Sequence, residues 1–160
     1  MQRLISLFVI AALLSLAGCS ALSPYSNYTK LELNLSGSSG LNPDISNRPS
    51  PIVVRLMELK HPVAFENADF FSLYERPKEA LSPDLVALEE LELRPGENRQ
   101  LKLTVNEGSR YVGVFAAYRD LPETEWQFII PLQDKALNQV NLRLDEQGIH
   151  AVSDAVAGKD

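Results

Sequence analysis

Short runs of alternating apolar and polar residues recur along most of the chain beyond residue 27. In residues 28–36, Leu31, Leu33 and Leu35 alternate with polar side chains, which is typical of a strand with one buried face. Other runs, such as 111–118, are apolar on both faces and predict interior strands. The predicted strands are 28–36, 52–60, 85–93, 101–105, 111–118, 125–131, 138–144 and a short strand from residue 149. About eight short strands separated by turn signals predict an all-β fold, a two-sheet β-sandwich.

One segment, residues 67–76, breaks this alternation. Asn67 is a good N-cap, and Pro77 disfavours helical geometry at the residue before it, so we expect a short helix between them. A further helical turn is expected at residues 81–84. The sequence therefore predicts a small helical insertion, at about residues 62–84, between the second and third strands.

Composition narrows the function classes. The chain has 160 residues, of which 45% are hydrophobic and 22% charged, and this fits one globular domain. A formal net charge of −6 with scattered lysines and arginines argues against a nucleic-acid partner. A single cysteine excludes a disulfide scaffold, and two histidines far from it leave little material for a metal site.

The first 18 residues have the pattern of a secretory signal. Arg3 supplies the positive charge, and residues 4–16 form an apolar run that is too short for a comfortable membrane span. The run closes with Leu-Ala-Gly-Cys at residues 16–19, which resembles the bacterial lipobox, in which the cysteine is lipidated. We therefore expect residues 1–18 to be removed and Cys19 to carry covalent lipid whose acyl chains include palmitate. The alternative is an ordinary cleaved signal with Cys19 as a bystander.

The predicted lipid anchor sets the position of the domain. Residues 19–27 form a lipidated tether that reaches at most about 30 Å when extended. The β-sandwich domain is expected at residues 28–152, followed by a flexible tail at 153–160. By resemblance to bacterial lipoproteins, Asp after the cysteine would favour inner-membrane retention; Ser20 occupies this position, so we expect the periplasmic face of the outer membrane. No cofactor beyond the lipid on Cys19 is expected.

The connection between the first two strands, residues 37–51, is the most informative loop. It is longer than the usual hairpin connection of about two to five residues, and its three prolines stiffen it. Leu41 and Ile45 are apolar residues in a segment that should be exposed. Either these two side chains fold the loop back onto the sandwich, or the loop is a preorganised surface for a partner.

Two further features are more often structural than functional. Tyr118 is expected to pack at the sheet edge, and Arg119 to pair with a neighbouring carboxylate. Catalysis has weak support because neither His61 nor His150 lies in a nucleophile motif. The adjacent carboxylates at 89–92 are more typical of a solvated strand face than of an acid–base pair. We do not expect an enzyme.

A set of segments lies in order along nearly the whole mature chain: residues 16–19, 41–44, 48–56, 68–74, 95–97 and 111–120, with Trp126. Together they resemble the TssJ family, the outer-membrane lipoproteins of the bacterial type VI secretion system. The resemblance implies a transthyretin-like β-sandwich with added helices. It also implies an anchoring role, in which the lipoprotein binds the periplasmic C-terminal region of TssM, an inner-membrane component, and the loop between the first two strands takes part in the contact.

The resemblance makes that loop the candidate partner-binding site. Its candidate residues are Leu41, Asn42, Asp44, Ile45, Arg48 and Ser50. The alternative function is a periplasmic carrier or inhibitor that binds a small or lipidic ligand between the sheets. A carrier needs a cavity, whereas aromatic side chains are expected to fill this core: Phe65, Phe70, Phe71, Phe115, Trp126 and Phe128. No small-molecule substrate, metal or nucleic acid is therefore expected.

Overall fold

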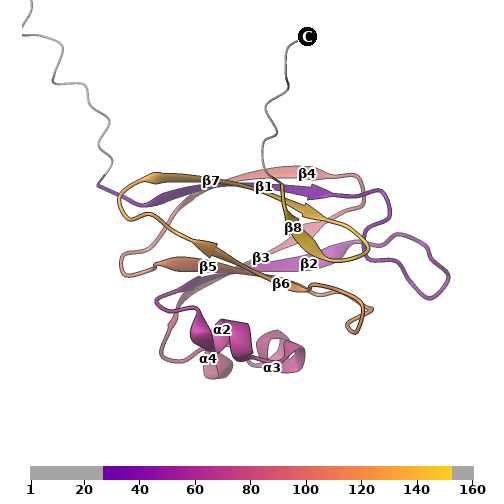
Figure 1. Cartoon of the computed structure of the whole chain (residues 1–160), viewed down its shortest axis with the longest axis horizontal. Helices are drawn as coiled ribbons and strands as arrows, with labels where there is room; N and C mark the ends of the chain where they lie inside the picture. Colours follow the sequence, from indigo (N-terminus) through magenta and orange to yellow (C-terminus); the bar gives the residue numbers. More distant parts are fainter. Residues whose placement is uncertain (1–26, 153–160) are drawn as a thin grey trace, which may run out of the picture.

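A computed structural model describes residues 27–152 and shows a β-sandwich with a layer of helices on one side (Figure 1). Two four-stranded sheets, with the strand orders β4-β1-β7-β8 and β3-β2-β5-β6, face each other. The strands are β1 (Lys30–Gly37), β2 (Ile52–Leu59), β3 (Leu85–Leu93), β4 (Asn98–Thr104), β5 (Tyr111–Ala116), β6 (Gln127–Pro131), β7 (Leu137–Leu144) and β8 (Ile149–Ala151). The predicted two-sheet sandwich of about eight strands is confirmed. The signal sequence (1–18), Cys19, most of the tether and the tail (153–160) lie outside the described residues.

Strand β1 lies inside its sheet and defines the two ends of the sandwich. It pairs with β4 in antiparallel and with β7 in parallel orientation, and its three alternating leucines are buried. The chain enters β1 at one end of the molecule and leaves it at the other, where the β1–β2 loop begins (Figure 1). We call these the entry end, around Thr29, and the loop end, around residues 38–51.

The core between the two sheets is mainly aliphatic. Leu31, Leu33 and Leu35 of β1 pack in one cluster with residues such as Val54 of β2 and Val114 of β5. The expectation that six aromatic residues fill this space is wrong for most of them. Phe128 packs against this cluster, and Trp126 contacts both it and the second cluster, which lies between the sheet and the helical layer. The other four lie on that side: Phe65, Phe70 and Phe71 from the helices and Phe115 from β5.

The helical insertion covers the outer face of the sheet β3-β2-β5-β6 (Figure 1). It consists of three short helices, α2 (Val63–Asn67), α3 (Phe70–Glu75) and α4 (Pro77–Ala80). The prediction that Asn67 caps the helix is wrong, because Asn67 ends α2 and Asp69 caps α3 by accepting hydrogen bonds from the backbone N–H and hydroxyl of Ser72. The expected helical turn at 81–84 is a non-helical turn that leads into β3. Within residues 27–152, no helix has the length and hydrophobicity to cross a membrane.

Two contacts fix the insertion to the sheet. The ring of Phe65 in α2 lies directly over Gly113 of β5, where an added Cβ would approach the ring to 2.7 Å, so any larger residue at this position would displace the ring. Arg55 of β2 donates hydrogen bonds to the carbonyl oxygens of Tyr74 at 2.6 Å and Leu73 at 3.3 Å. Its guanidinium also lies 5.1 Å from the centre of the Tyr74 ring. The Arg55 guanidinium therefore stabilises the last turn of α3 by donating to carbonyl groups that have no partner within the helix.

Candidate partner-binding site

The base of the β1–β2 loop is anchored in the body of the domain. Leu41 is fully buried and belongs to the inter-sheet core. Asn42 is also buried, and its amide nitrogen donates to the carbonyl oxygen of Pro51 at 3.0 Å while its amide oxygen accepts from the backbone N–H of Arg119 at 3.0 Å. The backbone of Asn42 has a positive φ of 47°, a conformation that asparagine tolerates better than most residues. These contacts join Asn42 to the last residue of the loop, just before β2, and to the connection that follows β5.

The tip of the loop is closed by an ion pair. The Asp44 carboxylate accepts hydrogen bonds from the backbone N–H groups of Ser46 at 2.8 Å and Arg48 at 3.0 Å. Its second oxygen lies 2.8 Å from Nε and 2.7 Å from Nη2 of Arg48, a two-point contact. The Arg48 side chain, and after it the Arg48 backbone N–H, lowers the pKa of the Asp44 carboxyl below its ordinary value. The tip is therefore a closed turn with a fixed shape.

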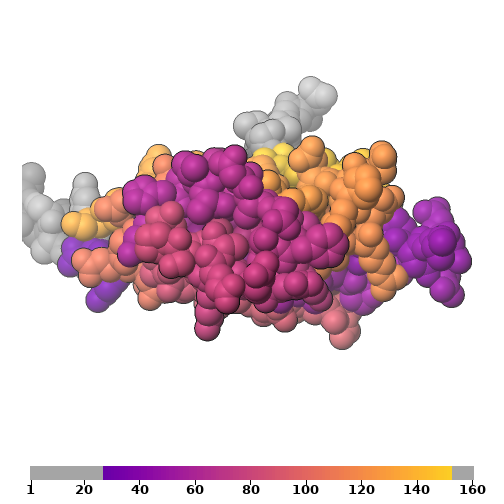
Figure 2. All heavy atoms as spheres, turned by 90° about the horizontal axis from the view of Figure 1, so that it is seen from below, coloured from indigo at the N-terminus to yellow at the C-terminus, as the bar shows by residue number. Residues whose placement is uncertain are grey.

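Ile45 is presented to solvent by this turn. Its relative exposure is 106%, the highest among the exposed large hydrophobic residues of the described chain. In the space-filling view the loop stands out from the body of the molecule at the loop end, next to the connection between β5 and β6 (Figure 2). Loop residues including Asp44 and Ile45 line an open hollow of about 660 Å³ with Arg119 and Asp120 of that connection.

The structure divides the six candidate residues into two groups. Leu41, Asn42 and Ser50 are buried and support the loop, whereas Ile45 and Arg48 are exposed and Asp44 is half-buried. The interpretation in which both apolar side chains fold the loop back onto the sandwich is correct for Leu41 and wrong for Ile45, which is exposed. Whether a partner binds these residues stays a prediction.

Arg119 is a candidate residue that the sequence did not reveal. Within residues 27–152 its guanidinium forms no ion pair, in contrast to the expected carboxylate partner, and its positive charge helps to lower the pKa of Asp44. Its neighbour Tyr118 is buried as expected, and this burial, followed by the charges of Asp145 and Glu146, raises the pKa of its hydroxyl. Arg119 is held at the hollow by the Asn42 contact, which joins residues 77 positions apart.

Other candidate chemistry is dispersed. His61 Nδ1 lies 2.8 Å from Asp84 Oδ1, but the imidazole side chain is 74% exposed and the pair joins the end of β2 to the turn before β3. Two of the β3 carboxylates form ion pairs, Glu90 with Arg55 at 2.8 Å and Glu92 with Arg94 at 3.2 Å. Within the described residues, no group of three or more His, Cys, Asp or Glu side chains is placed to hold a metal ion.

The comparisons with known proteins decide the family. A family model described as type VI secretion lipoprotein, VasD, EvfM, TssJ, VC_A0113 matches residues 29–147. The chain belongs to this family. The match spans every strand from β1 to β7 and includes the β1–β2 loop. No curated protein matches the chain.

Solved structures agree with this assignment. The type VI lipoprotein TssJ1 from Pseudomonas aeruginosa is 34% identical, with a TM-score of 0.76 over 78% of this chain and 95% of that one. Lip from Serratia marcescens, described as a membrane-bound component of the type VI system, has the same fold, with 24% identity and a TM-score of 0.73 over 78% and 98% of the two chains. A chain in a structure described as the TssM C-terminal domain from EAEC also shares the fold, with 18% identity and a TM-score of 0.66 over 78% and 98%.

Proposed function

We propose that this family member is acylated at Cys19, is held by that lipid at the periplasmic face of the outer membrane and binds the periplasmic C-terminal region of TssM through the β1–β2 loop. The observation that carries the proposal is the loop, which is fixed by Asn42 and by the Asp44–Arg48 pair and yet leaves Ile45 fully exposed. A partner that covers Ile45 gains apolar burial without having to order the loop. The proposed role requires no catalytic step.

Family membership supports both halves of the proposal. The family model is described as a secretion lipoprotein, which agrees with a lipid on the cysteine of the lipobox-like sequence. The description of one structure that contains this fold names the TssM C-terminal domain, which supports that domain as the partner.

The placement of the loop also supports the proposal. The chain reaches the domain from Cys19 through the entry end, and the loop lies at the opposite end of β1 (Figure 1). Eight residues of β1 separate the two, a distance of about 23 Å at the usual rise of a strand. An anchored domain therefore has its loop on the side away from the lipid attachment.

The loop contact is tested by Ile45→Asp. Calorimetry with the periplasmic region of TssM should show a loss of affinity of about tenfold or more, because a buried isoleucine contributes roughly 1.5–3 kcal/mol. Val63→Asp is the matched control, since Val63 is another exposed aliphatic residue, at 62%, located in α2. Equal affinity of Ile45→Asp and the unmodified protein, with an unchanged melting temperature, would place the interface elsewhere.

The anchor is tested separately by Cys19→Ser. Mass spectrometry of the mature chain from cells should show acyl chains on Cys19, and Cys19→Ser should release the protein from outer-membrane fractions while TssM binding in solution is kept. An unmodified Cys19 in the protein purified from cells would contradict the anchoring half and leave the loop contact unaffected.

A further inference from the structure

The entry end of the sandwich carries lysines that have no acidic partner. Lys30 begins β1, Lys60 follows β2, and Lys135 lies in the connection between β6 and β7. All three are exposed, and none forms an ion pair within residues 27–152. Backbone contacts bring these segments together, because Lys30 N donates to Ala136 O at 2.9 Å and Arg110 N donates to Leu59 O at 2.8 Å.

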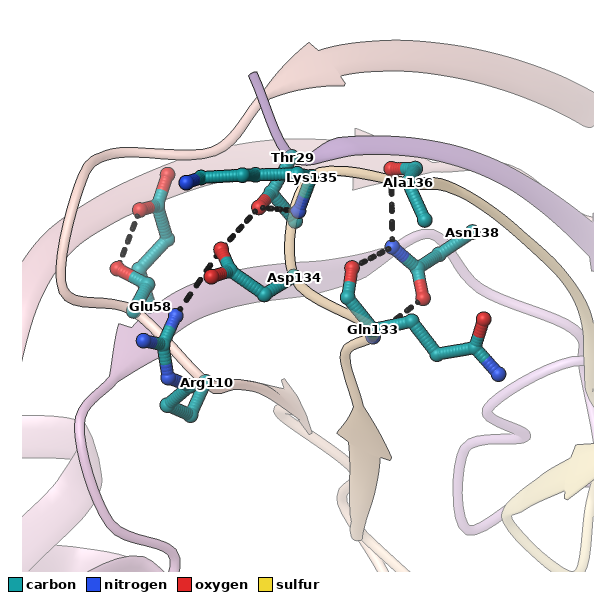
Figure 3. A network of polar contacts seen from close by, with 9 residues as sticks. Thr29, Glu58, Arg110, Gln133, Asp134, Lys135, Ala136 and Asn138 are labelled. Atoms are coloured by element: carbon teal, nitrogen blue, oxygen red, sulfur yellow. Dashed lines mark hydrogen bonds and ion pairs between the residues drawn. The ribbon is translucent and has the colours of Figure 1, made fainter. Parts of the chain in front are cut away.

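Most carboxylates at this end are already engaged. Asp134 accepts from the Thr29 hydroxyl at 3.1 Å and lies 3.1 Å from the guanidinium of Arg110, which joins the two sheets (Figure 3). Glu58 accepts from the backbone N–H of Asn106 at 2.8 Å and from the hydroxyl of Ser109 at 2.9 Å. Glu107 is exposed in the turn after β4 and opposes the lysines. Hydrogen bonds from neutral donors do not cancel the charge of a carboxylate, and Asp84, which lies beside Lys60 and 2.8 Å from His61 Nδ1, adds another at this end. The lysines are therefore matched in number by carboxylates, but the oxygens of Glu58 and Asp84 are held by neighbouring groups, whereas the lysine ammonium groups form no ion pair within residues 27–152.

Two large apolar side chains are exposed among these lysines. Tyr28 is 65% exposed just before β1, and Leu137 is 54% exposed at the start of β7, where it lies opposite Lys30 in the parallel register. A tyrosine, a leucine and several lysines on one surface have the composition of a membrane-interface contact, in which the rings sit at the headgroups and the ammonium groups meet lipid phosphates.

The short tether between Cys19 and the entry end favours a lipid bilayer as the partner of this surface. Only seven residues lie between Cys19 and Asn27, so a lipid on Cys19 keeps the entry end within about 30 Å of the bilayer. We propose that the entry end is a docking surface for anionic phospholipid, in which Lys30, Lys60 and Lys135 contact headgroups and Tyr28 and Leu137 enter the interface. The proposal rests on the acylation of Cys19 proposed above. Docking would orient the domain with β1 pointing away from the membrane and the loop toward the periplasm.

The experiment uses the three lysines as their own probes. The unacylated mature chain, residues 19–160, contains the whole described fold, and Cys19 is its single cysteine, so it can be coupled to a maleimide lipid in vesicles. The rate of lysine acetylation by an N-hydroxysuccinimide ester is read by mass spectrometry in phosphatidylcholine vesicles and in vesicles with phosphatidylglycerol, neither of which has a competing amine. Arg94→Lys adds a reference amine in the turn at the loop end without changing the charge.

Docking predicts that Lys30, Lys60 and Lys135 react about fivefold more slowly on anionic than on neutral vesicles, while the amine of Arg94→Lys reacts equally on both. Salt at 0.5 M, which shortens the Debye length to about 4 Å, should remove the protection. Lys30→Gln with Lys60→Gln should remove it at Lys135, whereas Lys30→Arg with Lys60→Arg should keep it. Equal rates at Lys135 on the two kinds of vesicle, or equal protection of the reference amine, would overturn the docking surface. Because the coupling replaces acylation and TssM is absent, neither result bears on the proposed function.

Discussion

The two irregular regions of the domain, the helical insertion and the β1–β2 loop, are stabilised in opposite ways. The insertion buries its aromatic side chains against the sheet, and its second core cluster includes Phe65, Leu73 and Phe115. The loop instead buries Leu41 at its base and closes its tip with polar contacts around Asp44. The apolar burial of the insertion contributes to the free energy of unfolding of the whole domain. The exposed tip of the loop contributes little to it, so residues there can be replaced with little loss of stability. This difference separates the residues that fold the domain from those that are available to a partner.

The largest expected effect is on the insertion. Phe65→Ala should lower the free energy of unfolding by about 3–5 kcal/mol, because it removes a fully buried ring and leaves a cavity over Gly113. Urea denaturation measures this loss. Phe71→Ala is the control, since Phe71 is 59% exposed and should cost less than about 1 kcal/mol. Equal losses for the two variants would mean that the insertion is not part of the cooperative core.

The contact between Phe65 and Gly113 can be tested as a pair. Gly113→Ala alone should cost about 1–3 kcal/mol, because the new methyl group meets the Phe65 ring. In the Phe65→Ala background the same methyl group enters the cavity, so the double variant should be more stable than the sum of the single losses by at least about 0.5 kcal/mol. Additive losses would contradict the contact.

Removal of the Arg55 guanidinium, which contacts the last turn of α3, should have the next largest effect on stability. Arg55→Ala should lower the free energy of unfolding by about 2–3 kcal/mol, because it leaves the carbonyl groups of Leu73 and Tyr74 without their donor. Glu90→Gln is the matched control, since Glu90 is the exposed partner of Arg55 and should cost less than about 1 kcal/mol. Comparable losses in chemical denaturation would make the ion pair, rather than the helix end, the important contact.

At the base of the loop a smaller loss is expected. Asn42→Ala removes two buried hydrogen bonds, from Arg119 N–H and to Pro51 O, and should cost about 1–2 kcal/mol. It should also weaken partner binding, because both the tip and Arg119 lose their common support. Ser46→Ala, at an exposed tip position, serves as the control. Retained TssM affinity in Asn42→Ala would show that the support of the base is dispensable.

The smallest expected effect concerns protonation at the tip. The pKa of Asp44 is lowered by Arg48, so the carboxylate is favoured in the folded protein; its contribution is present at neutral pH and lost as the pH falls below about 4. In a carbon-13 NMR titration, Arg48→Gln should raise the pKa of Asp44 toward its ordinary value. The pKa of Asp69, which is lowered by Ser72, should not change in that variant. An unchanged Asp44 would mean that the tip is not closed by this pair in solution.

The sequence predicted the parts of the molecule that depend on local pattern. The strands follow the alternation of residues such as Leu31, Leu33 and Leu35, so their bounds are correct to within a few residues. The pairings depend on distant segments and were not predictable: β1 lies in parallel beside β7, and the successive strands β3 and β4 lie in different sheets. Helix α2 has five residues and depends on the packing of Phe65, which has no local signal.

The candidate site, like the fold, was predictable only where it depends on local sequence. The loop was evident from its length and its prolines, and the apolar Ile45 stands out within it. The buried role of Asn42 and the position of Arg119 depend on a contact between residues 77 positions apart, which periodicity cannot reveal.

The central placement of β1 has a mechanical consequence. In the proposed arrangement, tension between a lipid-held N-terminus and a partner on the β1–β2 loop would act along β1, which connects the two ends. Its hydrogen bonds to β4 and β7 run across that direction, so they are loaded together in shear instead of being opened one after another. A strand flanked on both sides and pulled lengthwise resists extraction far better than an edge strand that can be peeled, which suits the proposed role of a link between a lipid anchor and a partner protein.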